Sequence, residues 1–327
     1  MEVWRSLIHP NNLNDRSARW GVIISSAEES MNSGEPRQHA PAIGVEPAVG
    51  SALVETLKRR THGRIFATSR LLRFVYWAYE HWLLRQLQQG PMPRHVGIIL
   101  DGNRRHARRR GVGDPREIYQ YGADKLDDAL DWCAELGIAA VTLWVFSTEN
   151  LKRSPTEVSG ILTAIETKIA ALAHDPFMHQ KRIRVRAIGR LDILPESLVA
   201  AIRAAEAATA KYDSMTLTIA TGYGGREEIV DAVGRFLETQ AKQGASLSDV
   251  IGKMTSDDIG RHLYAADLPD PDLIIRTSGE IRLSGFLLWQ SVHSEFYFTD
   301  VLWPAFRKID FLRAIRAYQG RSRRFGR

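Results

Sequence analysis

The sequence predicts an α/β fold in which helices flank a central, mostly parallel sheet of six strands. From residue 93 onward, short apolar runs alternate with longer stretches in which apolar residues recur at helical spacing. Alternation of this kind favours a parallel sheet with helices on both faces. A second observation agrees with the first, because charged residues gather directly after the apolar runs, where ligands bind in such folds.

The first part of the chain differs in composition from the rest. Residues 1–69 are rich in Ser, Asn, Pro, Gly and Glu and show little periodicity, which predicts a disordered extension before a single domain at residues 70–327. Residues 70–89 predict a helix, because apolar and aromatic residues recur at helical spacing among arginines until a Gly-Pro-Met-Pro stretch ends the pattern. We expect this helix to pack on its own domain, and peripheral contact with a membrane is the alternative.

Six apolar runs predict the strands, at residues 95–100, 139–146, 183–188, 215–220, 273–275 and 286–289. Helical spacing predicts the helices between and after them, at residues 119–136, 155–173, 195–211, 226–240, 256–263 and 310–318. The helix that begins near Pro155 carries a start signal, because Ser154 precedes the proline and Glu157 follows three residues after the serine. The run 222–225, Gly-Tyr-Gly-Gly, predicts a tight strand-to-helix turn, since its spacing is not that of a dinucleotide-binding motif.

Composition narrows the classes of partner. The 327 residues carry a net charge of +6, which suits nucleic acid, an anionic membrane surface or phosphorylated small molecules. Nucleic acid is not expected, because no known binding motif is present. The single cysteine, Cys133, excludes an internal disulfide and fits a reducing compartment. No apolar run reaches membrane-spanning length and no secretory signal is visible, so we expect a cytoplasmic protein.

Polar clusters follow four of the predicted strands. The first strand leads into Asp101-Gly-Asn-Arg-Arg-His106, the second into residues 147–153, the fourth into residues 221–226 and the fifth into Arg276. The carboxyl ends of parallel strands meet at one edge of the sheet, so we expect these clusters to form one basic pocket that contains a carboxylate. Arg104 and Arg105 are followed by three further arginines, and such crowding favours a bound anion.

The residues after the fifth strand predict diphosphate binding. Arg276, Arg282 and Ser284 lie close together in the sequence, and Glu295 follows. A guanidinium offers a planar fork of donors that matches two phosphate oxygens at once. Diphosphate is usually handled as its magnesium complex, so a nearby carboxylate completes the set.

Four motifs carry a resemblance to a known family. The runs 95–105 (HVGIILDGNRR), 146–150 (FSTEN), 222–226 (GYGGR) and 275–290 (IRTSGEIRLSGFLLWQ) resemble, in order, those of the cis-prenyltransferases. The resemblance extends from about residue 94 to residue 327. It implies a homodimeric α/β fold with a hydrophobic tunnel, and an enzyme that condenses isopentenyl diphosphate with an allylic diphosphate to form a Z double bond.

The resemblance also implies roles for individual residues. Asp101 would hold Mg²⁺ and Asn150 would take part in proton removal, while Glu295 would contact the metal of the isopentenyl diphosphate. The residues expected to bind substrate are Gly102, Asn103, Arg104, Arg105, His106, Ser147, Thr148, Glu149, Leu151, Arg153, Arg276, Arg282, Leu283 and Ser284. A C-terminal Arg-Phe-Gly at residues 324–326 would reach towards the neighbouring subunit.

Departures from the family pattern bear on the length of the product. Val145 stands where long-chain members have alanine, and a bulkier side chain there would narrow the tunnel near its start. Arg104, His106, Tyr119 and Leu151 also differ from the usual residues, and most of these changes resemble the short-chain branch. We therefore expect a short, C15-like product, with a long-chain polyprenyl diphosphate synthase or a non-catalytic partner subunit as alternatives.

One acidic run favours a different class of enzyme. Asp127, Asp128 and Asp131 match the Asp-Asp-x-x-Asp motif of the all-helical trans-prenyl synthases and terpene cyclases. The alternation of strands and helices argues against that fold, and no second acidic motif faces the first. We interpret these three aspartates as a solvated face of a helix.

Overall fold

The computed structural model describes residue 74 and residues 76–321. These residues belong to one compact unit, Ser69–Arg327. The predicted extension at residues 1–69 and the Arg-Phe-Gly at residues 324–326 lie outside the described residues. The boundary between extension and domain therefore stays a prediction.

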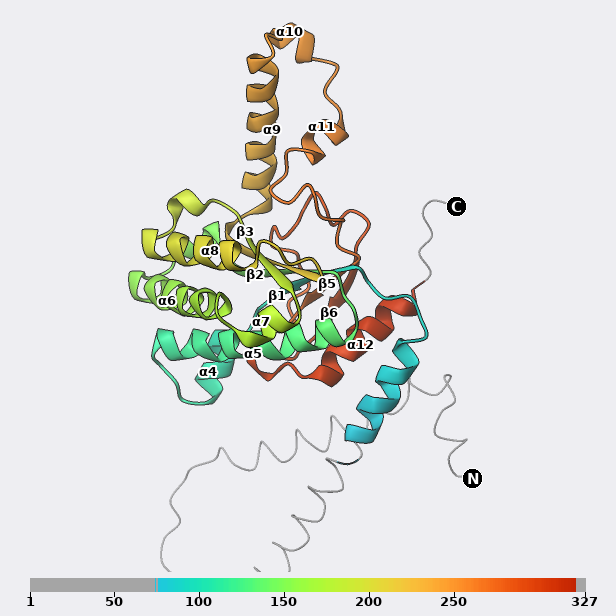
Figure 1. The fold of residues 1–327 in the computed structure, drawn as a ribbon. Coiled ribbons are helices and arrows are strands. Elements are labelled where there is room, and N and C mark those ends of the chain that lie inside the picture. The colour runs from blue at the N-terminus through green and yellow to red at the C-terminus, as the bar shows by residue number, and fades with distance from the viewer. Residues whose placement is uncertain (1–73, 75, 322–327) are drawn as a thin grey trace, which may run out of the picture. The chain divides into compact units, whose positions relative to one another are not determined.

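A six-stranded sheet lies at the centre of the unit, and each paired strand is parallel to its neighbour (Figure 1). The strands are β1 (His95–Ile99), β2 (Ala140–Ser147), β3 (Ile183–Ile188), β4 (Met215–Tyr223), β5 (Leu273–Arg276) and β6 (Glu295–Phe298). Their order in the sheet is β3-β4-β2-β1-β5-β6. Strands β2, β3 and β4 lie on one side of β1, and the later strands β5 and β6 lie on the other. The direction in which strands are added therefore reverses between β1 and β5. The fold prediction is confirmed, and the all-helical alternative is wrong.

The sixth strand was predicted at the wrong place. Residues 286–289 form turns, and Leu287 has a φ of 45°, which no strand adopts. The run is apolar because Phe286 and Leu287 are buried against the sheet, where Phe286 stacks on Trp144 with ring centroids 5.5 Å apart. The edge strand β6 instead has four half-buried residues and begins with a glutamate, so its pattern was weaker than that of the turn.

The helices largely match the prediction in position. They are α4 (Asn103–Arg109), α5 (Pro115–Glu135), α6 (Pro155–Leu172), α7 (Pro176–Gln180), α8 (Glu196–Thr209), α9 (Gly225–Lys242), α10 (Leu247–Val250), α11 (Ser256–Gly260) and α12 (Lys308–Gln319). Ser154 caps α6 as predicted, since its Oγ accepts the N–H of Glu157 at 3.3 Å. Helix α4 was missed, because its arginine-rich sequence has no apolar periodicity.

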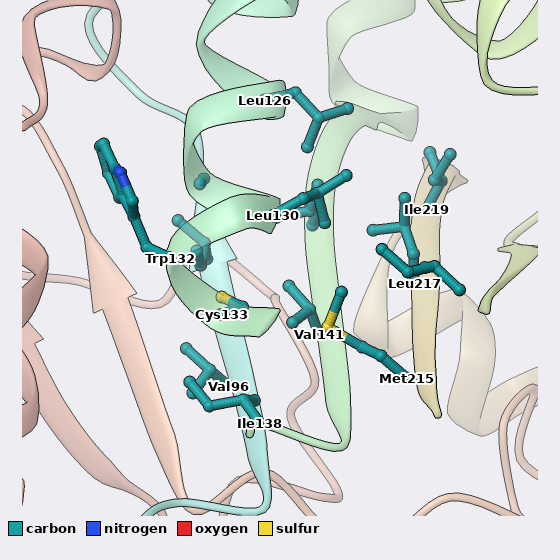
Figure 2. Packing of buried hydrophobic residues seen from close by; sticks show 14 of the residues in the cluster. Val96, Leu126, Leu130, Trp132, Cys133, Ile138, Val141, Met215, Leu217 and Ile219 are labelled. Carbon is teal, nitrogen blue, oxygen red and sulfur yellow. The ribbon is translucent and has the colours of Figure 1, made fainter. Parts of the chain in front are cut away.

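The core lies mainly on one face of the sheet. Figure 2 shows side chains of α5, among them Leu126 and Leu130, packed over β1, β2 and β4. Neighbouring residues in a strand point to opposite faces. Ile275 accordingly belongs to this cluster, whereas Ile274 packs with Phe286 on the other face.

The helix before β1, at residues 76–87, packs on its own unit as predicted (Figure 1). Leu83 and Leu87 are fully buried, and Gln319 of α12 donates a hydrogen bond of 2.8 Å to the carbonyl oxygen of Leu87. On its other side, Phe74, Trp77 and Trp82 are exposed. In the described part of the chain, no helix combines the length and the apolar character needed to cross a bilayer.

Candidate active site

Asp101 and Arg276 meet at the carboxyl edge of the sheet. Asp101 follows β1 and Arg276 ends β5, so the two side chains lie on either side of the point where the strand order reverses. Arg276 Nη2 donates a hydrogen bond of 2.9 Å to Asp101 Oδ2. Thr277 fixes the backbone of the loop, because its Oγ1 accepts the N–H of Asp101 at 3.0 Å and donates to the Asp101 carbonyl oxygen at 2.7 Å.

The guanidinium of Arg276 also holds the loop that follows β5. Its Nη1 donates to the carbonyl oxygen of Arg282 and, at 2.9 Å, to Ser284 Oγ. Arg276 is 4% exposed, so these hydrogen bonds form away from water, where they orient both groups firmly. The predicted cluster of Arg276, Arg282 and Ser284 is therefore brought together around one buried guanidinium.

The Asp101 carboxylate is kept ionised by this arrangement. Burial alone would raise its pKa, but hydrogen bonds from Arg276, Ser278 and the backbone of Gly102, together with the positive charge of Arg276, outweigh burial and lower the pKa below its ordinary value. The Asp101 side chain is 34% exposed, which leaves part of the carboxylate open to a ligand.

Two glycines allow the loops to come this close. Gly102 precedes α4 with a φ of 108°, and a Cβ there would lie 3.0 Å or less from Leu302. Gly225 begins α9, where its N–H donates to the carbonyl oxygen of Gly285 at 2.9 Å. A Cβ on Gly225 would lie 2.4 Å from that oxygen. The turn predicted at residues 222–225 is confirmed, and it supports the loop that carries Ser284.

Arginines and glutamates alternate around this edge. Arg104 and Arg105 project from the first turn of α4 and form ion pairs with Glu157 and Glu280, at 3.6 and 3.4 Å. Arg282 also pairs with Glu280. The arginines are 45–61% exposed in their side chains, so these pairs are weak and can open for an anion.

Tyr119 and Glu157 extend the site in a way the sequence did not predict. Tyr119 Oη donates to Glu157 Oε1 at 2.7 Å, and Arg153 Nη1 donates to both, at 2.9 and 2.8 Å. Burial and the hydrogen bond to Glu157 raise the pKa of Tyr119, so it stays protonated. The contact joins α5 to α6, and only the packing of those helices brings the three side chains together.

A cavity of about 550 Å³ begins at this edge and continues between the sheet, α5 and α6. Its mouth is lined by polar residues: Asp101, Gly102, Asn103, Arg104, Arg105, Arg108, Tyr119, Ser147, Glu149, Asn150, Arg153, Arg276, Glu280, Arg282 and Ser284. Its interior is apolar and includes Leu126, Leu143, Val145, Phe146, Ile161, Ala164, Ile165, Ile169, Leu172 and Ile219. Leu126 and Ile219 lie at the upper end of the packed layer in Figure 2. Arg108 and Glu280 are mouth residues that were not predicted; Arg108 lies one helical turn from Arg104.

Ser147 and Asn150 lie at the mouth but are tied to each other. Asn150 Oδ1 accepts the N–H of Ser147 at 3.0 Å, and Ser147 Oγ accepts the N–H of Asn150 at 3.2 Å. The two side chains thereby cap a short 3-10 helix, Thr148–Lys152, in addition to the cap that Ser154 gives α6. The capping fixes where Asn150 points.

Five predicted site residues do not line the cavity: His106, Thr148, Leu151, Leu283 and Glu295. His106 lies against Tyr121 with ring centroids 5.9 Å apart, and Leu151 is exposed. Glu295 begins β6 opposite Leu273, while Arg276 pairs with Phe298, so Glu295 lies three residues, about 10 Å, back from the carboxyl edge. It accepts a hydrogen bond of 2.6 Å from Arg321.

The residues at the mouth fit a magnesium ion held together with a substrate. In the part of the chain that the structure describes, no group of three or more His, Cys, Asp or Glu side chains could hold a metal. Asp101 offers one partly open, ionised carboxylate. Mg²⁺ often takes only one or two protein carboxylates, and phosphate oxygens and water supply the remaining ligands.

The acidic run on α5 does not face the cavity mouth. Asp127 pairs with Lys168 at 2.5 Å and Asp128 with Lys125 at 2.7 Å, and both carboxylates are 54% exposed. Asp131 is exposed as well. The interpretation of these aspartates as a solvated helix face agrees with the structure.

Comparison with known proteins identifies the family. The family model described as putative undecaprenyl diphosphate synthase matches residues 99–326. The chain is 54% identical over 279 residues to an isoprenyl transferase of Deinococcus radiodurans, a match that covers 85% of this chain and 100% of that one. It is 50% identical over 257 residues to a (2Z,6E)-farnesyl diphosphate synthase of Thermobifida fusca, covering 78% and 99%.

A solved structure agrees with this result. Lavandulyl diphosphate synthase from Lavandula x intermedia, in complex with dimethylallyl diphosphate, matches with a TM-score of 0.65 and 36% identity, covering 72% of this chain and 99% of that one. The sequence motifs, the fold and these relatives agree, and the chain therefore belongs to the cis-prenyltransferase family of enzymes.

Proposed function

We propose that this prenyltransferase condenses isopentenyl diphosphate with an allylic diphosphate and forms a Z-configured prenyl diphosphate with a short, C15-like chain. The observation that carries the proposal is that one and the same cavity has a cationic mouth and an apolar interior. An allylic diphosphate has the same two parts, a charged head and an apolar tail. Burial of the tail is favourable in proportion to the apolar area removed from water.

The mouth supplies what ionisation of an allylic diphosphate requires. The leaving diphosphate carries negative charge, and preorganised cations stabilise that charge as it develops. Arg104 and Arg105 would bind the allylic diphosphate, while Arg276, Arg282 and Ser284 would bind the isopentenyl diphosphate. Bound Mg²⁺, held by Asp101, would neutralise phosphate charge. Within one chain Asp101 is the carboxylate we assign to the metal, because Glu295 lies towards the opposite edge of the sheet.

Asn150 is placed at the mouth to take part in the step in which a proton leaves the isopentenyl unit. The Ser147 capping box fixes Asn150, and Asn150 lines the cavity mouth. We propose that Asn150 orients the isopentenyl unit for this step. The departing proton passes to the leaving diphosphate, the strongest base near the mouth.

Product length rests on a narrower observation. Val145 lies two residues before Ser147 on β2 and lines the cavity. Its two methyl groups narrow the passage compared with alanine, which supports a short product. The farnesyl name of the Thermobifida fusca relative agrees, whereas the undecaprenyl name of the family model favours the longer product as the second candidate.

The test is a product assay. Purified protein is incubated with isopentenyl diphosphate, Mg²⁺ and either geranyl or farnesyl diphosphate, and the products are measured by mass spectrometry. We expect a single condensation to dominate with geranyl diphosphate. Products of ten or more isoprene units would overturn the short-chain proposal, and the absence of any product would favour a non-catalytic partner subunit.

We also infer a homodimer, and peripheral membrane contact through the helix at residues 76–87. The exposed aromatic side chains Phe74, Trp77 and Trp82 support the membrane contact, because aromatic rings favour the membrane–water interface. Sedimentation would measure the oligomeric state. Co-sedimentation with vesicles, compared between the wild type and a Trp77→Ser/Trp82→Ser variant, would test the membrane contact.

A further inference from the structure

One charged residue interrupts the apolar interior of the cavity. Among the described residues that line it below the mouth, Lys168 is the cation. It projects from α6, 11 residues after Glu157, which corresponds to about 16 Å along the helix axis. Lys168 therefore lies at the deep end of the cavity, next to Ile169 and Leu172.

The lysine is held in this position from the neighbouring helix. Its Nζ lies 2.5 Å from Oδ1 of Asp127, which belongs to α5. The Lys168 side chain is 14% exposed, whereas that of Asp127 is 54% exposed. The ammonium group thus points outward to a carboxylate near solvent, and the aliphatic stem remains as part of the cavity wall.

We propose that Lys168, held by Asp127, is a specificity-determining residue that limits how long a prenyl chain the cavity accepts. This inference rests on the proposed function. A growing tail that passes Ile165 meets the Lys168 stem, and it must displace that stem to go further. The stem cannot simply turn into the cavity, because its ammonium would then lose both water and its carboxylate partner, which is costly.

The ion pair also restricts the gap between α5 and α6. These helices provide one side of the cavity, and Lys168 and Asp127 bridge them at its deep end. Separation of the helices by a bulkier tail would break the pair. Val145 near the mouth and Lys168 at depth therefore limit the tail at two different levels.

The first test is the product distribution of Lys168→Ala, made with geranyl diphosphate and with farnesyl diphosphate as primer. Truncation removes the stem from the wall and leaves Asp127 in solvent, so no buried charge is left unpaired. We expect the main product to lengthen by one or more isoprene units. An unchanged product distribution would overturn the proposal.

The chain offers a matched control on α5, the helix that carries Asp127. Lys125 and Asp128 of α5 form an ion pair of 2.7 Å with side-chain exposures of 21% and 54%, close to those of the Lys168 pair, and Lys125 does not line the cavity. We expect Lys125→Ala to give wild-type products. Equal lengthening in Lys125→Ala and Lys168→Ala would show a general loosening of the helices and would also overturn the proposal.

A third variant distinguishes the effect of the ion pair from the effect of the aliphatic stem of Lys168. Asp127→Ala changes a half-exposed residue outside the cavity, so it should fold even if Lys168→Ala does not, as melting temperatures will show. Without its partner the stem is no longer held in the wall, and we expect lengthening that is smaller than for Lys168→Ala. If the wild type forms no product, the proposed function fails. If it forms product and neither Lys168→Ala nor Asp127→Ala changes the length, this inference alone fails.

Discussion

The mouth and the interior of the cavity are built from different parts of the fold. The mouth consists of loops that follow β1, β2 and β5, and its charged side chains are fixed by hydrogen bonds such as that between Arg276 and Asp101. The interior consists of apolar side chains from α5, α6 and the strands. The difference predicts that rate and product length are separable properties. Changes at the mouth should alter the rate, and changes in the interior should alter the length.

The largest effect is expected for Asp101→Asn. The substitution keeps the size of the side chain but removes the charge that faces Arg276 and that we assign to metal binding. We expect prenyl transfer to slow by about 10²–10³-fold, a loss typical of removing one preorganised electrostatic contact. Steady-state kinetics would measure it, with Asp128→Asn as the exposed control. Wild-type turnover by Asp101→Asn would remove Asp101 from the mechanism.

Arg276→Lys should have the next largest effect. An ammonium keeps the positive charge but cannot bind Asp101, the Arg282 carbonyl and Ser284 with one planar group. We expect activity to fall on the order of 10–100-fold because both loops at the mouth lose their orientation. The residual product should have the wild-type length. A changed length would show that the mouth and the interior are not separable.

Val145→Ala is a change in the cavity interior that tests whether product length can be altered separately from rate. Two methyl groups are removed from the cavity wall, and we expect longer products with little change in the rate of the first condensation. Mass analysis of the products gives the answer. Loss of rate without a change in length would place Val145 in the reacting region instead.

A smaller effect concerns stability at the mouth. Burial alone would raise the pKa of Glu157, but hydrogen bonds from Tyr119 and Arg153 outweigh it and lower that pKa below the ordinary 4.5. Its ionised form therefore stabilises the fold above about pH 4.5, and this contribution is lost as the pH falls through the lowered pKa. We expect Glu157→Gln to melt about 2–4 °C below the wild type near pH 7.

The pH dependence of the melting temperature distinguishes loss of the Glu157 charge from loss of packing. The difference in melting temperature between wild type and Glu157→Gln should close as the pH is lowered below the ordinary pKa. A difference that stays constant from neutral to acid pH would mean that the carboxylate charge does not stabilise the mouth.

The sequence predicted the parts of this site that follow from strand order. Because parallel strands end at one edge, Asp101, Ser147 and Arg276 could be placed together from the sequence alone. Contacts that depend on how helices pack could not be derived in this way. The bridge from Tyr119 to Glu157, and that from Asp127 to Lys168, join helices whose relative rotation no local pattern encodes.

The errors have physical causes as well. The aromatic run at residues 286–289 was interpreted as a strand, yet its burial comes from turns that press Phe286 against Trp144. The true edge strand, Glu295–Phe298, is half-buried throughout and therefore lacks a strong apolar pattern. Because that strand was misplaced, the sequence did not reveal that Glu295, the residue expected to contact the metal of the isopentenyl diphosphate, lies about 10 Å back from the carboxyl edge within one chain.

The most direct test is a crystal structure with Mg²⁺ and an unreactive analogue of the allylic diphosphate. In this analogue, sulfur replaces the oxygen that joins the allylic carbon to the diphosphate, which prevents ionisation. The account predicts the diphosphate beside Asp101, Arg104 and Arg105, with the tail running between β2 and α6 towards Lys168. A tail that lies outside this cavity, or a diphosphate bound away from Asp101, would contradict it.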